Sequence, residues 1–379
     1  MKTTLSPLFH FAAIALASTS LMTGQVFGHA EDTNAKPKDD TKAVQPVATG
    51  TGENSYKTVP AWGDIPDKLL IGPTHGSVVV DKKGTIYVSS DSKNGFYVFS
   101  PDGKLLRTTG PEFSGVHGMM IREEDGVEYI YAAHLAKSQV VKLTLEGKAV
   151  LTISYPKEAR VPAPKPAAPK PGEPAPVAPV PDKDGLVPAY PEGKGYKPTG
   201  VTVGPNGDIY VVDGYGKSLV HRFDSKGKHI KTFGGKGKAD GQFETCHGIA
   251  LDTRYEKPLL LICDRANNRL QHFDLEGNFV AVITKDLRKP CAVSILGDKV
   301  AIAELEGRVT ILDKTNKPVA FLGDNPDKGQ WAKFDAPVAI WKEGIFCAPH
   351  GLSYDAQGNL YVQDWNKTGR VTKLVKSKG

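Results

Sequence analysis

Short stretches of alternating apolar and polar residues recur six times along the chain, separated by tight turns. The clearest example is FETCHGIALDTRYEKPLLLICDRANNRLQHF, from Phe243 to Phe273, which predicts two short strands, a turn and a third strand. Close variants of it begin at Gly72, Ser114, Lys197, Lys289 and Ala348. A repeat of about 40 to 50 residues is typical of propellers and similar arrays. The pattern therefore predicts an all-β fold, a six-bladed β-propeller.

Each repeat accommodates four strands joined by hairpin turns in which a glycine supplies a positive φ. The turns read Asp-x-x-Gly or Ser-x-x-Gly, as at 81–84, 100–103, 224–227 and 355–358. Because the sequence predicts no helical crossover between them, we expect the units to pack as blades around an axis. The sixth repeat lacks a fourth strand. We predict that Thr58–Leu70 supplies it, closing the ring and protecting the sheet edges.

The N-terminal residues 1–30 have the composition of a signal peptide. Lys2 provides a positive charge, Phe9–Met22 an apolar core, and Gly28-His29-Ala30 a cleavage site of small residues. The apolar run is too short, and too interrupted by Ser and Thr, for a stable membrane span. The sequence therefore predicts an exported protein, periplasmic or extracellular.

Two other segments differ from the repeats. Residues 31–57 are rich in Lys, Asp, Thr, Ala and Gly, which predicts a flexible tether before a propeller at 58–379. Val161–Pro181 is proline-rich and lies in an insertion at about 156–195. It predicts an extended arm between blades two and three, either a neutral spacer or an attachment or lid segment.

Charge and cysteine content narrow the classes of function. The 379 residues carry a net charge of +6 with acids and bases interspersed. The sequence has no basic stripe with interleaved aromatic residues, which argues against a nucleic-acid partner. After export, the cysteines would meet an oxidising compartment in which disulfides form, although their spacing predicts no pairing. These cysteines are Cys246, Cys263, Cys291 and Cys347. We expect a monomer.

Residues at the same point of each first strand meet around the axis of a propeller. Aligning the repeats brings six residues to that point: His75, His117, Thr199, His247, Cys291 and His350. His117, His247 and His350 come from alternate blades, about 120° apart, so three imidazoles can converge on one ion. Three histidines with an open position are the ligand set of a catalytic zinc. His75 and Cys291 are further candidate ligands that would suit copper or iron. A ring of histidines around ordered water is the structural alternative.

A second ring is predicted where each second strand ends: Ser89, Ser90, Asp91, His134, Asp213, Asp264, Glu304 and Asp364. Acids there often cap loop amides of their own blade, an interpretation favoured for Glu304 and Asp364. Tyr215 and Arg265 project from loops at the same mouth of the channel. Above a metal they would suit a base and an oxyanion or carboxylate clamp. For Arg265, an ion pair with the neighbouring Asp264 is the structural alternative.

The segments GQFETCHGIALD and CDRANNRLQHFD resemble the NHL repeat. More specifically, residues from about 72 to 373 resemble the lyase domain of peptidyl-α-hydroxyglycine α-amidating lyase, a six-bladed propeller of this repeat. The resemblance implies zinc bound through His117 (GVHGM), His247 (TCHGIAL) and His350 (APHGL). It also implies a catalytic Tyr215 in an Asp-Gly-Tyr motif, and it matches Arg265 to the Arg of the family's Asp-Arg-x-Asn segment.

Three positions depart from that family's pattern. A catalytic Arg in the first blade is replaced by the Ser90-Asp91 pair, a Met before the third ligand by Ala348, and an acidic residue tied to a structural calcium by Gly351. If the reaction is retained, zinc polarises a hydroxyl oxygen and Tyr215 removes a proton as the carbon–nitrogen bond breaks, releasing glyoxylate and an amide. Arg265 is the candidate replacement for the missing Arg, and calcium is a further candidate cofactor.

The sequence leaves three classes of function open. The first is a zinc-dependent lyase acting on a small-molecule or peptide substrate in the channel. The second is a non-catalytic propeller that binds a protein or other polymer on one face. The third is a copper or iron redox protein that uses the same His/Cys ring. Bound metal separates the first and third from the second, and the identity and coordination number of that metal separate the first from the third.

Overall fold

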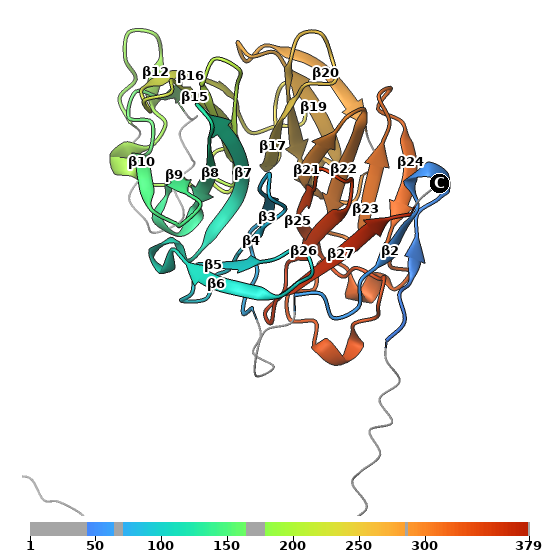
Figure 1. Cartoon of the computed structure of the whole chain (residues 1–379). Helices are drawn as coiled ribbons and strands as arrows, with labels where there is room; N and C mark the ends of the chain where they lie inside the picture. The colour runs from blue at the N-terminus through green and yellow to red at the C-terminus, as the bar shows by residue number, and fades with distance from the viewer. Residues whose placement is uncertain (1–43, 64–70, 164–178, 285–286, 378–379) are drawn as a thin grey trace, which may run out of the picture. The chain divides into compact units, whose positions relative to one another are not determined.

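Antiparallel sheets arranged around a common axis make up the structure, a computed structural model that describes residues 44–63, 71–163, 179–284 and 287–377 (Figure 1). Within these ranges there is no α-helix, and no helix is long and apolar enough to cross a membrane. Each of the six repeats forms one blade. The predicted six-bladed β-propeller is confirmed.

The first five blades each contain four strands in sequence order. Blade one consists of β3 (Val78–Val80), β4 (Ile86–Ser89), β5 (Phe96–Phe99) and β6 (Leu105–Thr109). Blade two consists of β7 (Val116–Glu124), β8 (Val127–His134), β9 (Gln139–Thr144) and β10 (Ala149–Ile153). Blade three consists of β13 (Gly200–Val203), β14 (Ile209–Asp213), β15 (Leu219–Phe223) and β16 (His229–Gly234).

Blade four consists of β17 (Cys246–Asp252), β18 (Leu259–Asp264), β19 (Arg269–Phe273) and β20 (Phe279–Thr284). Blade five consists of β21 (Pro290–Leu296), β22 (Lys299–Glu304), β23 (Arg308–Leu312) and β24 (Pro318–Leu322). Short 3-10 helices connect the strands: η1 (Gly52–Asn54), η3 (Pro111–Phe113), η4 (Leu135–Lys137), η5 (Pro191–Gly193), η6 (Arg265–Asn267), η7 (Lys328–Gln330) and η8 (Val338–Ile340).

An N-terminal strand completes the sixth blade, as predicted, but it comes from an earlier segment than expected. The sheet runs β1 (Ala48–Thr49), β2 (Tyr56–Thr58), β27 (Arg370–Lys376), β26 (Leu360–Asp364) and β25 (Pro349–Tyr354). Pairing of β2 with β27 aligns Thr58 with Leu374. Tyr56 and Thr58 are buried on either side of an exposed Lys57, a pattern too short to stand out in the sequence.

These strands correct two predictions. The tether assigned to 31–57 is wrong for residues 44–57, which contain β1, η1 and β2, because Tyr56 is needed to fill the core of the last blade. The closing strand predicted over Thr58–Leu70 overlaps β2 only at Thr58. Residues 64–70, the predicted signal peptide at 1–30 and the tether residues 31–43 lie outside the described residues.

The core lies between neighbouring blades. All five residues of β14 are buried, because the sheet is covered on both faces by the adjacent blades. The predicted turns are also confirmed: Gly84, at φ +80°, donates its amide hydrogen to the carbonyl of Asp81 at 2.9 Å. The Asp81 side chain accepts the amide hydrogens of Lys83 and Thr85, so the acid fixes the turn.

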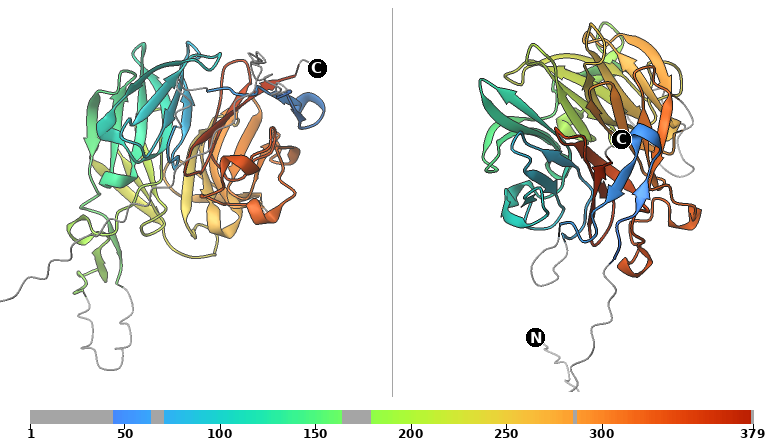
Figure 2. Two further views of the ribbon diagram at one scale, coloured as in Figure 1. Left: turned by 90° about the horizontal axis from the view of Figure 1, so that it is seen from below. Right: turned by 45° about the vertical axis from the view of Figure 1, so that its right-hand side comes forward.

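The insertion before blade three is anchored at its base. Strands β11 (Arg160–Pro162) and β12 (Leu186–Pro188) form a two-stranded antiparallel sheet at the base of the insertion (Figure 2). Tyr190 and Tyr196 follow it and pack, 3% and 0% exposed, into the core of blade three. The extended arm predicted for Val161–Pro181 falls largely on residues 164–178, outside the described residues. The insertion is therefore held on both sides by packed structure.

The four cysteines are free and buried. The sequence left disulfides open, and the structure pairs none of these thiols. Cys246 and Cys263 lie in apolar clusters between blades. Cys291 packs with Leu305 and Ala348, and Cys347 lies in the connection before β25 and donates its amide hydrogen to Asp364.

Candidate functional site

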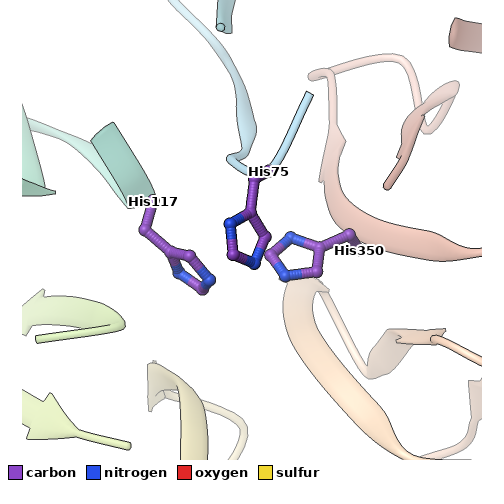
Figure 3. A group of neighbouring side chains, drawn as sticks. All are labelled: His75, His117 and His350. Carbon is purple, nitrogen blue, oxygen red and sulfur yellow. The ribbon is translucent and has the colours of Figure 1, made fainter. Parts of the chain in front are cut away.

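Four histidines converge on the axis of the propeller. His117 belongs to β7, His247 to β17 and His350 to β25, and His75 precedes β3. The ring centroids of His117, His247 and His350 lie 4.7, 4.7 and 4.8 Å apart. Figure 3 shows His75, His117 and His350 directed toward one another from three different blades. The alignment of repeats therefore identified the axial residues correctly.

Irregular pairing at the start of the first strands turns these rings inward. The register between β7 and β8 shifts between Val116 and Met119, and that between β25 and β26 shifts between Pro349 and Gly351. A bulge of this kind redirects a side chain that regular pleating would send elsewhere. A third shift, between Cys246 and Ile249, flanks His247, so His117, His247 and His350 each lie at a local distortion of their own blade.

The three alternate-blade histidines are fixed by the same contact. Nδ1 of His117 donates to the carbonyl of Thr199 at 2.6 Å, and Nδ1 of His247 donates to that of Cys291 at 2.8 Å. Nδ1 of His350 donates to the carbonyl of Gly76 at 2.9 Å. In every case the acceptor lies in the next blade, either within its first strand (Cys291) or just before it (Thr199 and Gly76). Because a carbonyl only accepts, Nδ1 carries the hydrogen and Nε2 of the neutral ring has a free lone pair.

A glycine after each of these histidines makes this contact possible. A Cβ at Gly118 would lie 2.4 Å from the Thr199 carbonyl oxygen, and one at Gly248 would lie 2.4 Å from that of Cys291. A Cβ at Gly351 would lie 2.6 Å from the Cα of Ser77. The His-Gly motif thus couples an imidazole directed at the axis to a close approach of neighbouring backbones.

The site keeps its histidines neutral. Burial lowers the pKa of His117, His247 and His350 well below the usual value, and the other rings of the cluster or Arg265 lower it further. Burial and the Arg265 charge lower the pKa of His75 to about 4. Nε2 of His117 and of His350 is buried and has no hydrogen-bond partner among the described residues. Buried lone pairs of this kind favour a cation between them.

Two groups of side chains bring ligand atoms within 4.8 Å of one another: His75, His117 and His350, and His247, Cys291 and His350. Three imidazoles bound to one tetrahedral ion at about 2.0–2.1 Å place their ring centroids about 5 Å apart. The centroid separations of 4.7–4.8 Å among His117, His247 and His350 are close to that value. The axial residues therefore suit a metal ion, but His117, His247 and His350 together form neither of the two groups. One ion bound by all three requires their Nε2 atoms to move closer together.

Tyr215 and Arg265 meet above the histidines. Arg265 Nη1 donates to the Tyr215 hydroxyl at 2.9 Å, and this oxygen lies 3.1 Å from Nε2 of His247 and 3.2 Å from Nε2 of His75. Burial raises the pKa of Tyr215, an effect that the Arg265 charge opposes. Asp264 pairs with Arg269 at 2.7 Å, so the ion pair considered for Arg265 is replaced by its contact with Tyr215.

The second ring is structural, as favoured for Glu304 and Asp364. Asp364 accepts the amide hydrogens of Cys347 and Ala348, and Glu304 accepts that of Arg288. Asp213 accepts those of Lys197 and Lys217. Other members of the ring also bond to backbone: His134 contacts the carbonyl of Ser114, and Ser90 donates to that of Ile71. These residues hold the loops that carry the site.

Two aromatic residues near the site, Trp365 and Phe334, were not predicted from the sequence. The Trp365 ring lies 5.8 Å from that of His75, and Phe334 lies 4.9 Å from Trp365. Trp365 follows Asp364 directly, as Arg265 follows Asp264, so its position in the repeat was a usable signal. Phe334 lies in the long connection between β24 and β25, outside the repeat pattern, and no sequence signal identifies it.

A cavity of about 40 Å³ adjoins the histidines and is lined by residues in or just before the first strands of all six blades, including Gly118, Met119, Gly248 and Ile249. Such a volume accommodates roughly three waters or a small ion. Tyr215 and Arg265 do not line it. A peptide is too large for this space and would have to approach from the side of Tyr215 and Arg265.

Residues 196–223, from Tyr196 to the end of β15, match the NHL repeat. A segment of 52 residues is 42% identical to Protein lin-41 of Caenorhabditis elegans, a match that spans 14% of this chain and only 4% of that protein. The chain is thus a six-bladed β-propeller that carries an NHL repeat.

Solved propellers of low sequence identity share the fold. A streptogramin B lyase structure is 13% identical, with a TM-score of 0.51, over 87% of this chain and 98% of that one. Virginiamycin B lyase from Staphylococcus aureus is 16% identical, with a TM-score of 0.50, over 80% and 95%. A catalytically inactive histidine-to-alanine variant of the latter, with quinupristin, is 14% identical, with a TM-score of 0.51, over 84% and 98%. At these identities the likeness extends to the fold alone.

Proposed function

We propose that the axial histidines bind one zinc ion and that the Tyr215–Arg265 pair beside it carries out the proton transfers of a lyase-type reaction. The observation that carries this proposal is the shared contact of His117, His247 and His350, in which each Nδ1 donates to a carbonyl of the next blade. Partners of this type fix the tautomer and the orientation of metal-binding histidines. Three neutral imidazoles, each with an Nε2 lone pair that can bind a metal, suit zinc, which accepts nitrogen ligands and keeps an open position in catalytic sites.

The protein groups around the ion have separate tasks. His117 and His350 offer lone pairs that no described group uses, and His247 offers one that the Tyr215 hydroxyl occupies at 3.1 Å. When His247 turns to the ion, Tyr215 retains Arg265 as a donor and His75 Nε2 as an acceptor. The bound zinc would supply Lewis-acid polarisation of a substrate oxygen.

Tyr215 is the group that exchanges a proton with the substrate. Its hydroxyl lies 3.2 Å from His75 Nε2, and the Arg265 cation, which donates to the same oxygen at 2.9 Å, stabilises the phenolate that would act as the base. This arrangement also supports Arg265 as the replacement for the arginine that the Ser90-Asp91 pair lacks. The half-buried Trp365 and Phe334 border the same mouth and would exclude water from it.

Fold neighbours at 13–16% identity share only the fold, but their described activities suggest which class of reaction to test first. They include a streptogramin B lyase and a virginiamycin B lyase, and a histidine-to-alanine variant of the second is described as catalytically inactive. The first substrates to test are peptides that end in α-hydroxyglycine, with glyoxylate release as the readout. This choice follows from the resemblance of the motifs around His117, Tyr215, His247 and His350 to the amidating lyases.

Zinc titration of the metal-free protein tests the ligand assignment. We expect one zinc per chain, and at least a 100-fold weaker affinity for His117→Ala and for His350→Ala, because each loses one of three ligands. His229→Ala is the matched control, since His229 lies on β16 and contacts Thr232 rather than the axis. Equal zinc affinity in all four proteins would refute the metal site and leave the alternative of a binding propeller.

A second experiment separates the chemistry from the metal. Tyr215→Phe should keep its zinc, because the phenol is not a ligand, and should lose turnover by about 10²–10⁴-fold, the usual contribution of a positioned acid or base. Full glyoxylate release by Tyr215→Phe would remove this residue from the mechanism. Stoichiometric zinc without turnover of any α-hydroxyglycine peptide would refute the assigned reaction while leaving the metal site intact.

A further inference from the structure

Cys291 places a thiol beside the proposed metal site, although the proposed set of three histidine ligands does not include it. Sγ of Cys291 and the ligand nitrogens of His247 and His350 all lie within 4.8 Å of one another, and all three residues are buried. Cys291 is the second residue of β21, the first strand of blade five, which lies between the blades of the two histidines. His117, in blade two, lies across the axis from it. The pair His247 and His350 thus has an imidazole on one side and a thiol on the other.

Only one ion can use this pair at a time. Nδ1 of His247 donates to the backbone carbonyl of Cys291, and Nδ1 of His350 donates to that of Gly76. Each ring therefore has a single free nitrogen, Nε2, for a metal. His117 and Cys291 consequently act on the same ion, the one that His247 and His350 hold.

We propose that Cys291 is a metal ligand, so that an ion held by His247 and His350 also takes a thiolate, and that the channel therefore selects thiophilic transition-metal ions. The inference rests on the proposed metal site, whose two ligands it shares. A donor set of two imidazoles and one thiolate suits zinc, cobalt or copper and excludes magnesium, calcium and manganese, which prefer oxygen ligands.

The local contacts of Cys291 are compatible with this role. Its thiol makes a long contact of 3.5 Å with the carbonyl of Lys289, a weak hydrogen bond that a metal–sulfur bond would replace, and it also interacts with the Arg265 side chain. Binding forms one bond from sulfur to the ion and releases the thiol proton to solvent. The Arg265 cation interacts electrostatically with the Cys291 sulfur and would therefore balance the negative charge of the thiolate.

Cys291 also orients the neighbouring ligand His247. The Cys291 carbonyl accepts from His247, so its backbone orients one ligand while its side chain provides another. Replacing Cys291 by Ser keeps the carbonyl and a side chain of similar size. Cys291→Ser therefore removes the sulfur donor and leaves the orientation of His247 unchanged.

Cobalt(II) is the probe of choice, because it takes the same tetrahedral sites as zinc, does not oxidise thiols and gives a thiolate-to-cobalt charge-transfer absorption in the near ultraviolet. Metal-free wild-type protein is titrated with Co²⁺ and then with Zn²⁺ as competitor. The variants are Cys291→Ser and, as a matched control, Cys263→Ser, since Cys263 is another fully buried thiol outside both ligand groups. Circular dichroism and thermal melts verify that each variant is folded.

We expect wild type and Cys263→Ser to show the charge-transfer band at one cobalt per chain, and zinc to abolish it. Cys291→Ser should bind one cobalt through its imidazoles without the band. Cobalt binding to wild type without a thiolate band would overturn the role of Cys291 and leave the zinc proposal standing. The same band in Cys291→Ser would also overturn it. Conversely, a thiolate band together with undiminished affinity in His117→Ala would refute the three-histidine set while supporting Cys291.

Discussion

The glycine after each axial histidine allows a quantitative test of how the site is held. At Gly118, a Cβ would lie 2.4 Å from the Thr199 carbonyl oxygen and 2.8 Å from the Gly200 Cα, both of them backbone atoms. Ordinary contact begins at 3.4 Å, so Gly118→Ala requires β7 and β13 to separate by about 1 Å. The same displacement would lengthen the His117–Thr199 hydrogen bond from 2.6 Å to about 3.6 Å, which is too long for a hydrogen bond.

Two consequences follow from that displacement. The His117 ring loses the partner that fixes its orientation, a change that typically costs about 10- to 100-fold in metal affinity, or about 1.4–2.8 kcal/mol. The metal-free protein loses stability by about 1–3 kcal/mol, as expected for an overpacked contact. The first effect is specific to the site, whereas the second is general.

Zinc affinity measured by competition with a chromophoric chelator, together with urea denaturation of the metal-free protein, separates these effects. Gly329→Ala is the matched control: Gly329 lies in η7, and its added Cβ would meet only the side-chain oxygen of Asp327, at 3.1 Å. We expect wild-type zinc affinity in this control. A Gly118→Ala protein that is destabilised but binds zinc within twofold of wild type would show that the Nδ1 contact does not orient His117.

Three further results are expected. Arg254→Met should destabilise the fold by about 3–5 kcal/mol in urea, because the fully buried Asp252 carboxylate loses its arginine partner at 2.6 Å and keeps only His272 as a side-chain partner; a loss below 1 kcal/mol would contradict this. Tyr190→Phe should cost about 1–3 kcal/mol, because it removes the hydrogen bonds to Asp213 and His221, and unchanged stability would show that the insertion is not anchored there. Burial lowers the pKa of His221 to about 3, so its contribution is complete above pH 6.5 and is lost as the pH falls toward 3. Between pH 8 and 5, wild type should lose about 2 kcal/mol more than His221→Gln, and equal losses would contradict the low pKa.

The blades and the axial histidines were predictable because both depend on the repeat. Alternation in strands such as Ile209–Asp213, and turns such as Asp81–Gly84, are local features that a sequence displays directly. The ring of His117, His247 and His350 follows from matched positions in the repeats and from the geometry of any propeller. Tyr215 and Arg265 were predictable because each lies in the loop that follows the second strand of its blade.

What could not be predicted depends on contacts between blades or between distant segments. The carbonyl that holds His350 belongs to Gly76, at the other end of the propeller sequence, and comes into reach only when the ring closes. Closure itself uses Tyr56–Thr58, a strand of three residues with little pattern of its own. Tyr190 lies in a segment dominated by proline, yet its hydroxyl bonds to Asp213 in the core of blade three.

The central claim is that a metal ion lies on the propeller axis between histidines of alternate blades. Anomalous X-ray scattering at the zinc edge, from crystals of the protein grown with zinc and without chelator, tests it most directly. We predict one axial peak, about 2.0–2.1 Å from Nε2 of His117 and of His350. An axis with no anomalous peak at saturating zinc, or zinc bound only on the surface, would contradict the account.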